Sequence, residues 1–322
     1  MERRTLHGTD LECARAVMGT MTFGSQVDRD EAQAMVDTCL AAGVTMFDTA
    51  NAYNDGRSEE MLADLLRGRR EDVQIATKVA NRMGSGPDDA GLSKAAIHKA
   101  IDASLQRLGI DHVDLYHLHK PDWSTPIEES LEAMEELVKA GKIRYAASSN
   151  YAAWQVAEML WIAERNGWQP LRVSQQMYNL VARRIEDEYA AFSRQHAISD
   201  IVYNPLAGGL LTGKHRPESV PAPGTRFTKD AYRQRYWNDR QFAAVEDLGR
   251  IAADAGMSLL ELAFRWLLSR PLVDAVLIGA SSMDQLRSNL AACEHASLDE
   301  EVAARCDEVW TRLDGAAPRY NR

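Results

Sequence analysis

Short apolar runs alternate with helical segments along most of this 322-residue chain. Eight runs rich in Val, Ile, Leu and aromatic residues have the length of buried strands, and the segments between them carry the periodicity of amphipathic helices. The strand candidates are 16–19, 45–48, 74–78, 113–117, 143–148, 173–176, 201–203 and 275–278. Because parallel strands need long, right-handed crossovers, this alternation predicts a closed (β/α)8 TIM barrel of the α/β class.

The predicted helices have clear ends. Gly43, Gly109 and Gly141 each follow a helical segment, at the position where a left-handed C-cap favours glycine. Barrels of this size commonly fold as one unit, so we predict a single domain over residues 1–322. The helices are predicted at 29–42, 58–67, 94–108, 126–140, 152–165 and 185–196, followed by helices within 239–268.

Three segments lie outside the repeat. Residues 3–6 and 10–13 flank a His-Gly-Thr turn and predict an N-terminal hairpin that plugs the N-terminal mouth of the barrel. Residues 298–313 predict a C-terminal helix. Residues 216–239 contain Pro217, Pro221, Pro223 and Gly224, and we predict a long functional loop without secondary structure of its own.

Composition excludes several classes of function. The net charge of −10 and the pI of about 5.4 argue against nucleic acid as a partner. No stretch of about 18 apolar residues predicts a membrane span. Neither the four cysteines nor the three histidines near the fourth strand have the spacing of a metal site. The cysteines are Cys13, Cys39, Cys293 and Cys306, and the histidines are His112, His117 and His119. We interpret the cysteines as reduced thiols of a cytoplasmic protein.

Chemically complementary side chains follow three consecutive strands. Asp48, Lys78 and His119 lie at or just past the C-terminal ends of the second, third and fourth strands, where barrel enzymes build their active sites. Three strand ends span about 10 Å, so these side chains can bound one pocket that Tyr53 enters from a short loop. A tyrosine beside a cation held by a carboxylate can act as a general acid, and an imidazole can polarise a carbonyl oxygen. The set suits carbonyl reduction.

Each of these residues also has a more ordinary interpretation. Taken singly, a loop tyrosine is more often packed, a strand-end lysine solvated, and a histidine merely hydrogen-bonded in place. Residues 208–214 fit most of the phosphate-loop pattern GxxxxGK[ST], but His215 replaces the required hydroxyl and the motif follows a late strand. The sequence therefore favours the carbonyl-reducing set.

The runs Phe47-Asp48-Thr49-Ala50-Asn51-Ala52-Tyr53, Ala76-Thr77-Lys78 and Asp114-Leu115-Tyr116-His117-Leu118-His119 resemble signatures of the aldo-keto reductases. The resemblance continues in order through 148–150, 175–179, 203–206, 209–214 and 285–289, and covers essentially the whole chain. The long loop after the seventh strand resembles that of the bacterial branch related to potassium-channel β-subunits.

The resemblance implies a catalytic tetrad, in which Tyr53 is the acid/base and Asp48, Lys78 and His119 support it. It implies NADP(H), or NAD(H), as cofactor, a small carbonyl compound as substrate, and a monomer or small homo-oligomer. The implied cofactor contacts are Ser149, Asn150, Gln175 and Tyr203 at the nicotinamide, Leu206, Gly209, Leu211 and Lys214 at the pyrophosphate, and Gly279, Ser281, Gln285 and Asn289 at the adenosine.

The chain departs from the family pattern at three positions. Ser281 stands where an arginine is frequent, which weakens the case for strict NADPH preference. Lys120 stands where an aromatic residue is frequent, and Met177 replaces a frequent carboxylate. Trp123 and Trp237 lie on mouth loops, where they line the pocket or merely pack. A cofactor-sensing binding module with residual reductase activity is the alternative to an enzyme.

Overall fold

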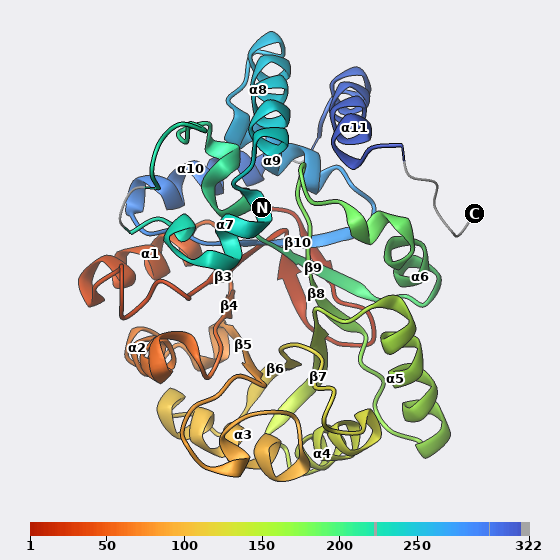
Figure 1. Cartoon of the computed structure of the whole chain (residues 1–322). Coiled ribbons are helices and arrows are strands. Elements are labelled where there is room, and N and C mark those ends of the chain that lie inside the picture. The colour runs from red at the N-terminus through yellow and green to blue at the C-terminus, as the bar shows by residue number, and fades with distance from the viewer. Residues whose placement is uncertain (222–223, 296, 317–322) are drawn as a thin grey trace.

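The computed structural model describes residues 1–221, 224–295 and 297–316, and its centre is a closed parallel barrel (Figure 1). Each strand pairs in parallel with the next, and the last closes on the first. The predicted barrel is confirmed. Its strands are β3 (Ala16–Gly19), β4 (Met46–Asp48), β5 (Gln74–Val79), β6 (Val113–Leu118), β7 (Ile143–Ser149), β8 (Val173–Met177), β9 (Ser199–Tyr203) and β10 (Val273–Ile278).

Helices surround the strands and bury their apolar faces against them (Figure 1). Gly43, Gly109 and Gly141 have the predicted positive φ, of 80°, 64° and 71°. The helix predicted over 185–196 is shorter than expected, because its first residues form a 3-10 turn. The helix that follows β10 was not predicted. The helices are α1 (Arg29–Ala41), α2 (Arg57–Leu65), α3 (Lys94–Leu108), α4 (Ile127–Lys139), α5 (Ala153–Asn166), α6 (Tyr189–Gln195), α8 (Asp239–Asp254), α9 (Leu259–Leu268), α10 (Met283–Glu294) and α11 (Glu300–Asp314).

The N-terminal hairpin pairs β1 (Arg3–Thr5) with β2 (Glu12–Ala14) and closes one end of the barrel. Leu6 and Leu11 are fully or almost fully buried, and they pack with side chains from the strands in a cluster separate from the outer core. The strand members of this inner cluster are Val17, Met46, Ala76, Leu115, Ala147, Val173, Ile201 and Ala275. The predicted hairpin plug is therefore confirmed.

The prediction that residues 216–239 lack secondary structure is wrong. They contain a 3-10 turn (Arg226–Thr228) and α7 (Asp230–Tyr236). Phe227 and Tyr236 are fully buried, and the Trp237 ring lies 4.9 Å from that of Phe227. These aromatic side chains give the segment a small core, which its prolines and glycines conceal in the sequence. Pro223 lies outside the described residues.

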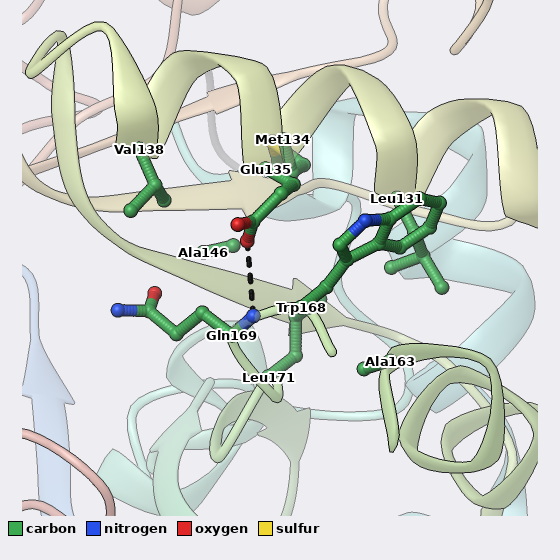
Figure 2. Close-up of a pocket in the computed structure, with 9 residues that line it drawn as sticks. All are labelled: Leu131, Met134, Glu135, Val138, Ala146, Ala163, Trp168, Gln169 and Leu171. Carbon is green, nitrogen blue, oxygen red and sulfur yellow. Dashed lines mark hydrogen bonds between the residues drawn. The ribbon is translucent and has the colours of Figure 1, made fainter. Parts of the chain in front are cut away.

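Two concavities lie away from the C-terminal ends of the strands. In a crevice between α4 and the segment before β8, Glu135 accepts a hydrogen bond of 2.9 Å from the backbone of Gln169, and most of the surrounding side chains are apolar (Figure 2). A polar cleft of about 490 Å³ lies at the N-terminal ends of the strands, where Asp114 joins Arg70 and Arg144 in salt bridges of 3.0 and 2.8 Å. Both concavities lie outside the predicted catalytic mouth.

Candidate active site

A buried ion pair forms the base of the site. Lys78, in β5, donates hydrogen bonds to the Asp48 carboxylate at the end of β4 and, at 2.7 Å, to the carbonyl of Thr49. The side chains of Lys78 and Asp48 are only 0% and 2% exposed. Gln175, in β8, reaches across the barrel and donates to the second oxygen of Asp48 at 3.0 Å. The two charges are therefore paired and fixed in place.

Tyr53 lies over this ion pair, at the start of a 3-10 turn (Tyr53–Gly56) that follows β4. The Lys78 Nζ atom is 5.2 Å from the centre of the phenol ring. Burial raises the pKa of Tyr53 more than the Lys78 charge lowers it, so the phenol keeps its proton. Burial works to lower the pKa of Lys78, but Asp48 and Tyr53 together raise it. Lys78 is therefore a cation beneath a neutral tyrosine.

His119 lies beside Tyr53, with ring centres 6.0 Å apart and planes nearly perpendicular. Burial and the charge of Lys78 lower the pKa of His119 to about 3, so the imidazole is neutral. Its Nδ1 atom is 3.3 Å from the Asn81 side-chain nitrogen, which can only donate. Nδ1 therefore accepts, and the ring proton is on Nε2. Asn81 was not predicted, although a polar side chain two residues past a strand end at this mouth was a possible signal.

The residues predicted at the nicotinamide form one hydrogen-bonded chain with the tetrad. The Asn150 side chain donates to the backbone carbonyl of His119 at 2.9 Å and accepts from the Tyr203 hydroxyl at 2.6 Å. It also donates to Ser149, whose hydroxyl donates to the backbone of Gln175 at 3.0 Å. The structure thus brings together residues from β6 to β9.

The loop after β9 forms a 3-10 segment (Ala207–Thr212) with an open face at Gly209. Gly209 has a φ of 104°, and a Cβ atom placed on it would lie 3.5 Å from His215 Nε2 and 4.0 Å from Lys214 Nζ. The space in front of this glycine therefore faces nitrogen atoms, as an anion requires. His215 Nε2 is buried and has no hydrogen-bond partner among the described residues.

The two leucines predicted at the pyrophosphate lie in the same loop. Leu206 is half-buried, whereas the Leu211 side chain is fully buried in the core. Leu211 can therefore reach a cofactor only through its backbone.

The residues predicted at the adenosine gather between the end of β10 and α10. Asn289 donates to the carbonyl of Gly279 at 3.1 Å, and its own buried side-chain oxygen has no partner among the described residues. Gln285 accepts hydrogen bonds from the backbone and the hydroxyl of Ser281, at 3.0 and 3.1 Å. The open acceptor of Asn289 and the nitrogen-lined space at Gly209 fit a dinucleotide.

Arg226 was not predicted as a site residue, yet it lies at the mouth. Its Nη2 atom is 3.9 Å from the position a Cβ would take on Gly279, and its charge acts to lower the pKa of Tyr53. Its Nη1 atom contacts the sulfur of Met21 at 3.4 Å and the hydroxyl of Tyr232 at 3.2 Å. Neither partner neutralises the guanidinium. An arginine in a long loop at this end of a barrel was the only sequence signal.

The sequence profile described as "Aldo/keto reductase family" matches residues 15–311 of the chain. The chain belongs to the aldo/keto reductase family. It is 36% identical to a rat protein named aflatoxin B1 aldehyde reductase member 2, over 95% of this chain and 87% of that one. It is also 36% identical to human aldo-keto reductase family 7 member A3, over 95% and 96% of the two chains. A probable voltage-gated potassium channel subunit beta from rice is 35% identical, over 91% and 92%.

Trp123, Trp237 and Lys120, which the sequence places on the mouth loops of this family member, lie at the surface or pack against other side chains. Trp123 is 79% exposed and its ring lies 6.3 Å from that of Trp154, whereas Trp237 packs in the aromatic cluster of the long loop. Lys120 is exposed.

Within residues 1–221, 224–295 and 297–316, no three His, Cys, Asp or Glu side chains form a group that could hold a metal ion. Over the same ranges, no helix has the length and hydropathy of a membrane span.

Proposed function

We propose that this aldo/keto reductase reduces aldehydes or ketones to alcohols, with Tyr53 as the proton donor. The observation that carries the proposal is the buried Asp48–Lys78 pair beneath a protonated Tyr53 and beside a neutral His119. A neutral acid, a fixed cation and a neutral imidazole donor are the groups that carbonyl reduction needs.

A reduced nicotinamide, when bound, would supply the hydride for the carbonyl carbon. His119 directs its Nε2–H at the carbonyl oxygen and so orients the substrate. Tyr53 gives its proton to the same oxygen, which completes the alcohol. Lys78 stabilises the phenolate that remains, and Asp48 keeps Lys78 in position.

The cofactor is proposed to be NADP(H), or NAD(H), along the line of residues described above. Ser149, Asn150, Gln175 and Tyr203 would hold the nicotinamide. Gly209 and Lys214, with the backbone of Leu206 and Leu211, would hold the pyrophosphate together with Arg226. The adenosine would lie at Gly279, Ser281, Gln285 and Asn289, where the Asn289 oxygen needs a donor.

The substrate is proposed to be a small carbonyl compound, as the aldehyde named for the rat relative suggests. The single domain, the cytoplasmic location, the bacterial branch and the monomeric or small oligomeric state stay predictions. Similarity to a potassium channel β-subunit supports a second candidate, a cofactor-sensing module with residual turnover.

A turnover assay tests the proposal. We expect NADPH to be consumed with 4-nitrobenzaldehyde, and one alcohol to form for each cofactor oxidised. Cofactor binding without turnover across a panel of aldehydes, ketones and sugars would contradict the enzyme and favour the binding module. The same panel, run with NADPH and with NADH, narrows the substrate class.

A further inference from the structure

The start of α10 and the residues just before it carry hydrogen-bond donors among the residues proposed for the adenosine. A helix N-terminus presents backbone N–H groups and a partial positive charge, and so it attracts anions. The relevant donors are the backbone N–H of Met283 and the backbone and hydroxyl groups of Ser281. A cofactor with a 2′-phosphate on its adenosine ribose would compete for these donors.

Each of these donors already has a partner within the protein. Glu31, in the first turn of α1, accepts a hydrogen bond of 3.0 Å from the Met283 N–H. Gln285 accepts both hydrogen bonds from Ser281. The Ser282 hydroxyl caps the helix by accepting from the backbone of Gln285 at 3.4 Å. Glu31 and Gln285 therefore already occupy these donors, and Glu31 is a carboxylate.

We infer that Glu31 sets the discrimination between NADPH and NADH, by opposing a 2′-phosphate at α10 and accepting a hydrogen bond from a 2′-hydroxyl. The inference rests on the adenosine position in the proposed function. Like charges at a shared site disfavour each other, whereas a carboxylate is a good acceptor for a ribose hydroxyl.

The local charges support this assignment. Ser281 supplies no cation to offset Glu31, and the Arg226 guanidinium, which lies near Gly279, donates hydrogen bonds to Met21 and Tyr232. The Met283 N–H holds the carboxylate, and Asp28 fixes the backbone of Glu31 by accepting its N–H at 3.0 Å at the start of α1. The expected consequence is a chain that binds NADH within about tenfold of NADPH, about 1.4 kcal/mol.

The test measures dissociation constants of NADPH and NADH from quenching of protein fluorescence, without turnover. In Glu31→Gln, the amide oxygen can still accept from Met283, so the helix contact is kept while the charge is lost. We expect this variant to bind NADPH about tenfold more tightly and NADH no more tightly than the parent does. Adenosine 2′,5′-bisphosphate should show the same gain, and AMP should show none.

Asp30→Asn is the matched control, because it removes the same charge one residue earlier from a side chain that is 97% exposed. It should change the NADPH-to-NADH ratio by less than about twofold. An unchanged ratio in Glu31→Gln, or an equal change in both variants, would overturn the role of Glu31. If neither cofactor bound the parent, the proposed function would fall as well, so the two failures are distinguishable.

Discussion

The two ends of the proposed cofactor site are built from different environments. At the tetrad, Lys78 and Asp48 are buried and paired, and their positions follow from two adjacent strands. At the adenosine end, Ser281 is partly exposed and Gln285 is exposed, and Glu31 reaches the backbone of the neighbouring Met283 from another helix. Buried charges make the chemistry intolerant of change, whereas exposed polar groups allow the choice of cofactor to vary.

Tyr53→Phe should have the largest effect. The ring keeps its shape and loses only the transferable proton, so kcat for carbonyl reduction should fall by about 10²–10⁴-fold while cofactor affinity stays nearly unchanged. Steady-state kinetics and cofactor titration measure the two quantities. Tyr145→Phe removes a hydroxyl bonded to Asp10 at the opposite face and should leave kcat unchanged. Retention of more than about a tenth of kcat would remove Tyr53 from the acid role.

Lys78→Met should lower kcat by about a hundredfold and also change the pH profile. Lys78 acts to lower the pKa of Tyr53, so its removal raises that pKa further. Alcohol oxidation needs the phenolate, and its rise with pH should therefore move to higher pH. The free energy of unfolding should fall by about 3–5 kcal/mol, because Asp48 loses its buried partner. An unshifted profile at near-normal rate would refute the coupling. Asp48→Asn should be milder, since it perturbs Lys78 but leaves the proton donor Tyr53 intact.

Arg226→Gln tests the region between the two ends. A charge-assisted contact to a phosphate is lost, so both NADPH and NADH should bind about tenfold more weakly, with kcat at saturation little changed. Arg233→Gln, an exposed arginine in the same segment, is the control for net charge. If both variants weakened binding equally, the effect would belong to the general field and not to the position of Arg226.

Ser281→Arg should have the smallest effect in the parent. An arginine at this position would tighten NADPH several-fold and leave NADH nearly untouched. Because the new guanidinium would first pair with Glu31, the gain should be larger in the Glu31→Gln background. Fluorescence titration of the parent, the two single variants and the double variant gives the coupling energy between Ser281→Arg and Glu31→Gln. Equal gains for both cofactors would place the 2′-phosphate elsewhere.

The fold was predictable because it depends on local periodicity. The 94–108 helix and the 16–19 strand have the predicted ends, and the other predicted strands differ by a few residues. The convergence of Asp48, Lys78 and His119 was also predictable, since residues at the ends of neighbouring parallel strands must lie close together. Asn81, Arg226 and Glu31 were not, because loop conformations and helix packing bring them to partners far away in the chain. Arg226 and Met21, for example, are 205 residues apart.

The hairpin plug also bears on where the proposed acid regains its proton. Leu6 and Leu11 pack against an apolar layer of strand side chains, which closes the hairpin end of the barrel. If Tyr53 is the acid, as proposed, solvent would return its proton from the mouth side, where the cofactor and the product would also lie. Protonation of Tyr53 for the next turnover would then depend on water reaching the mouth.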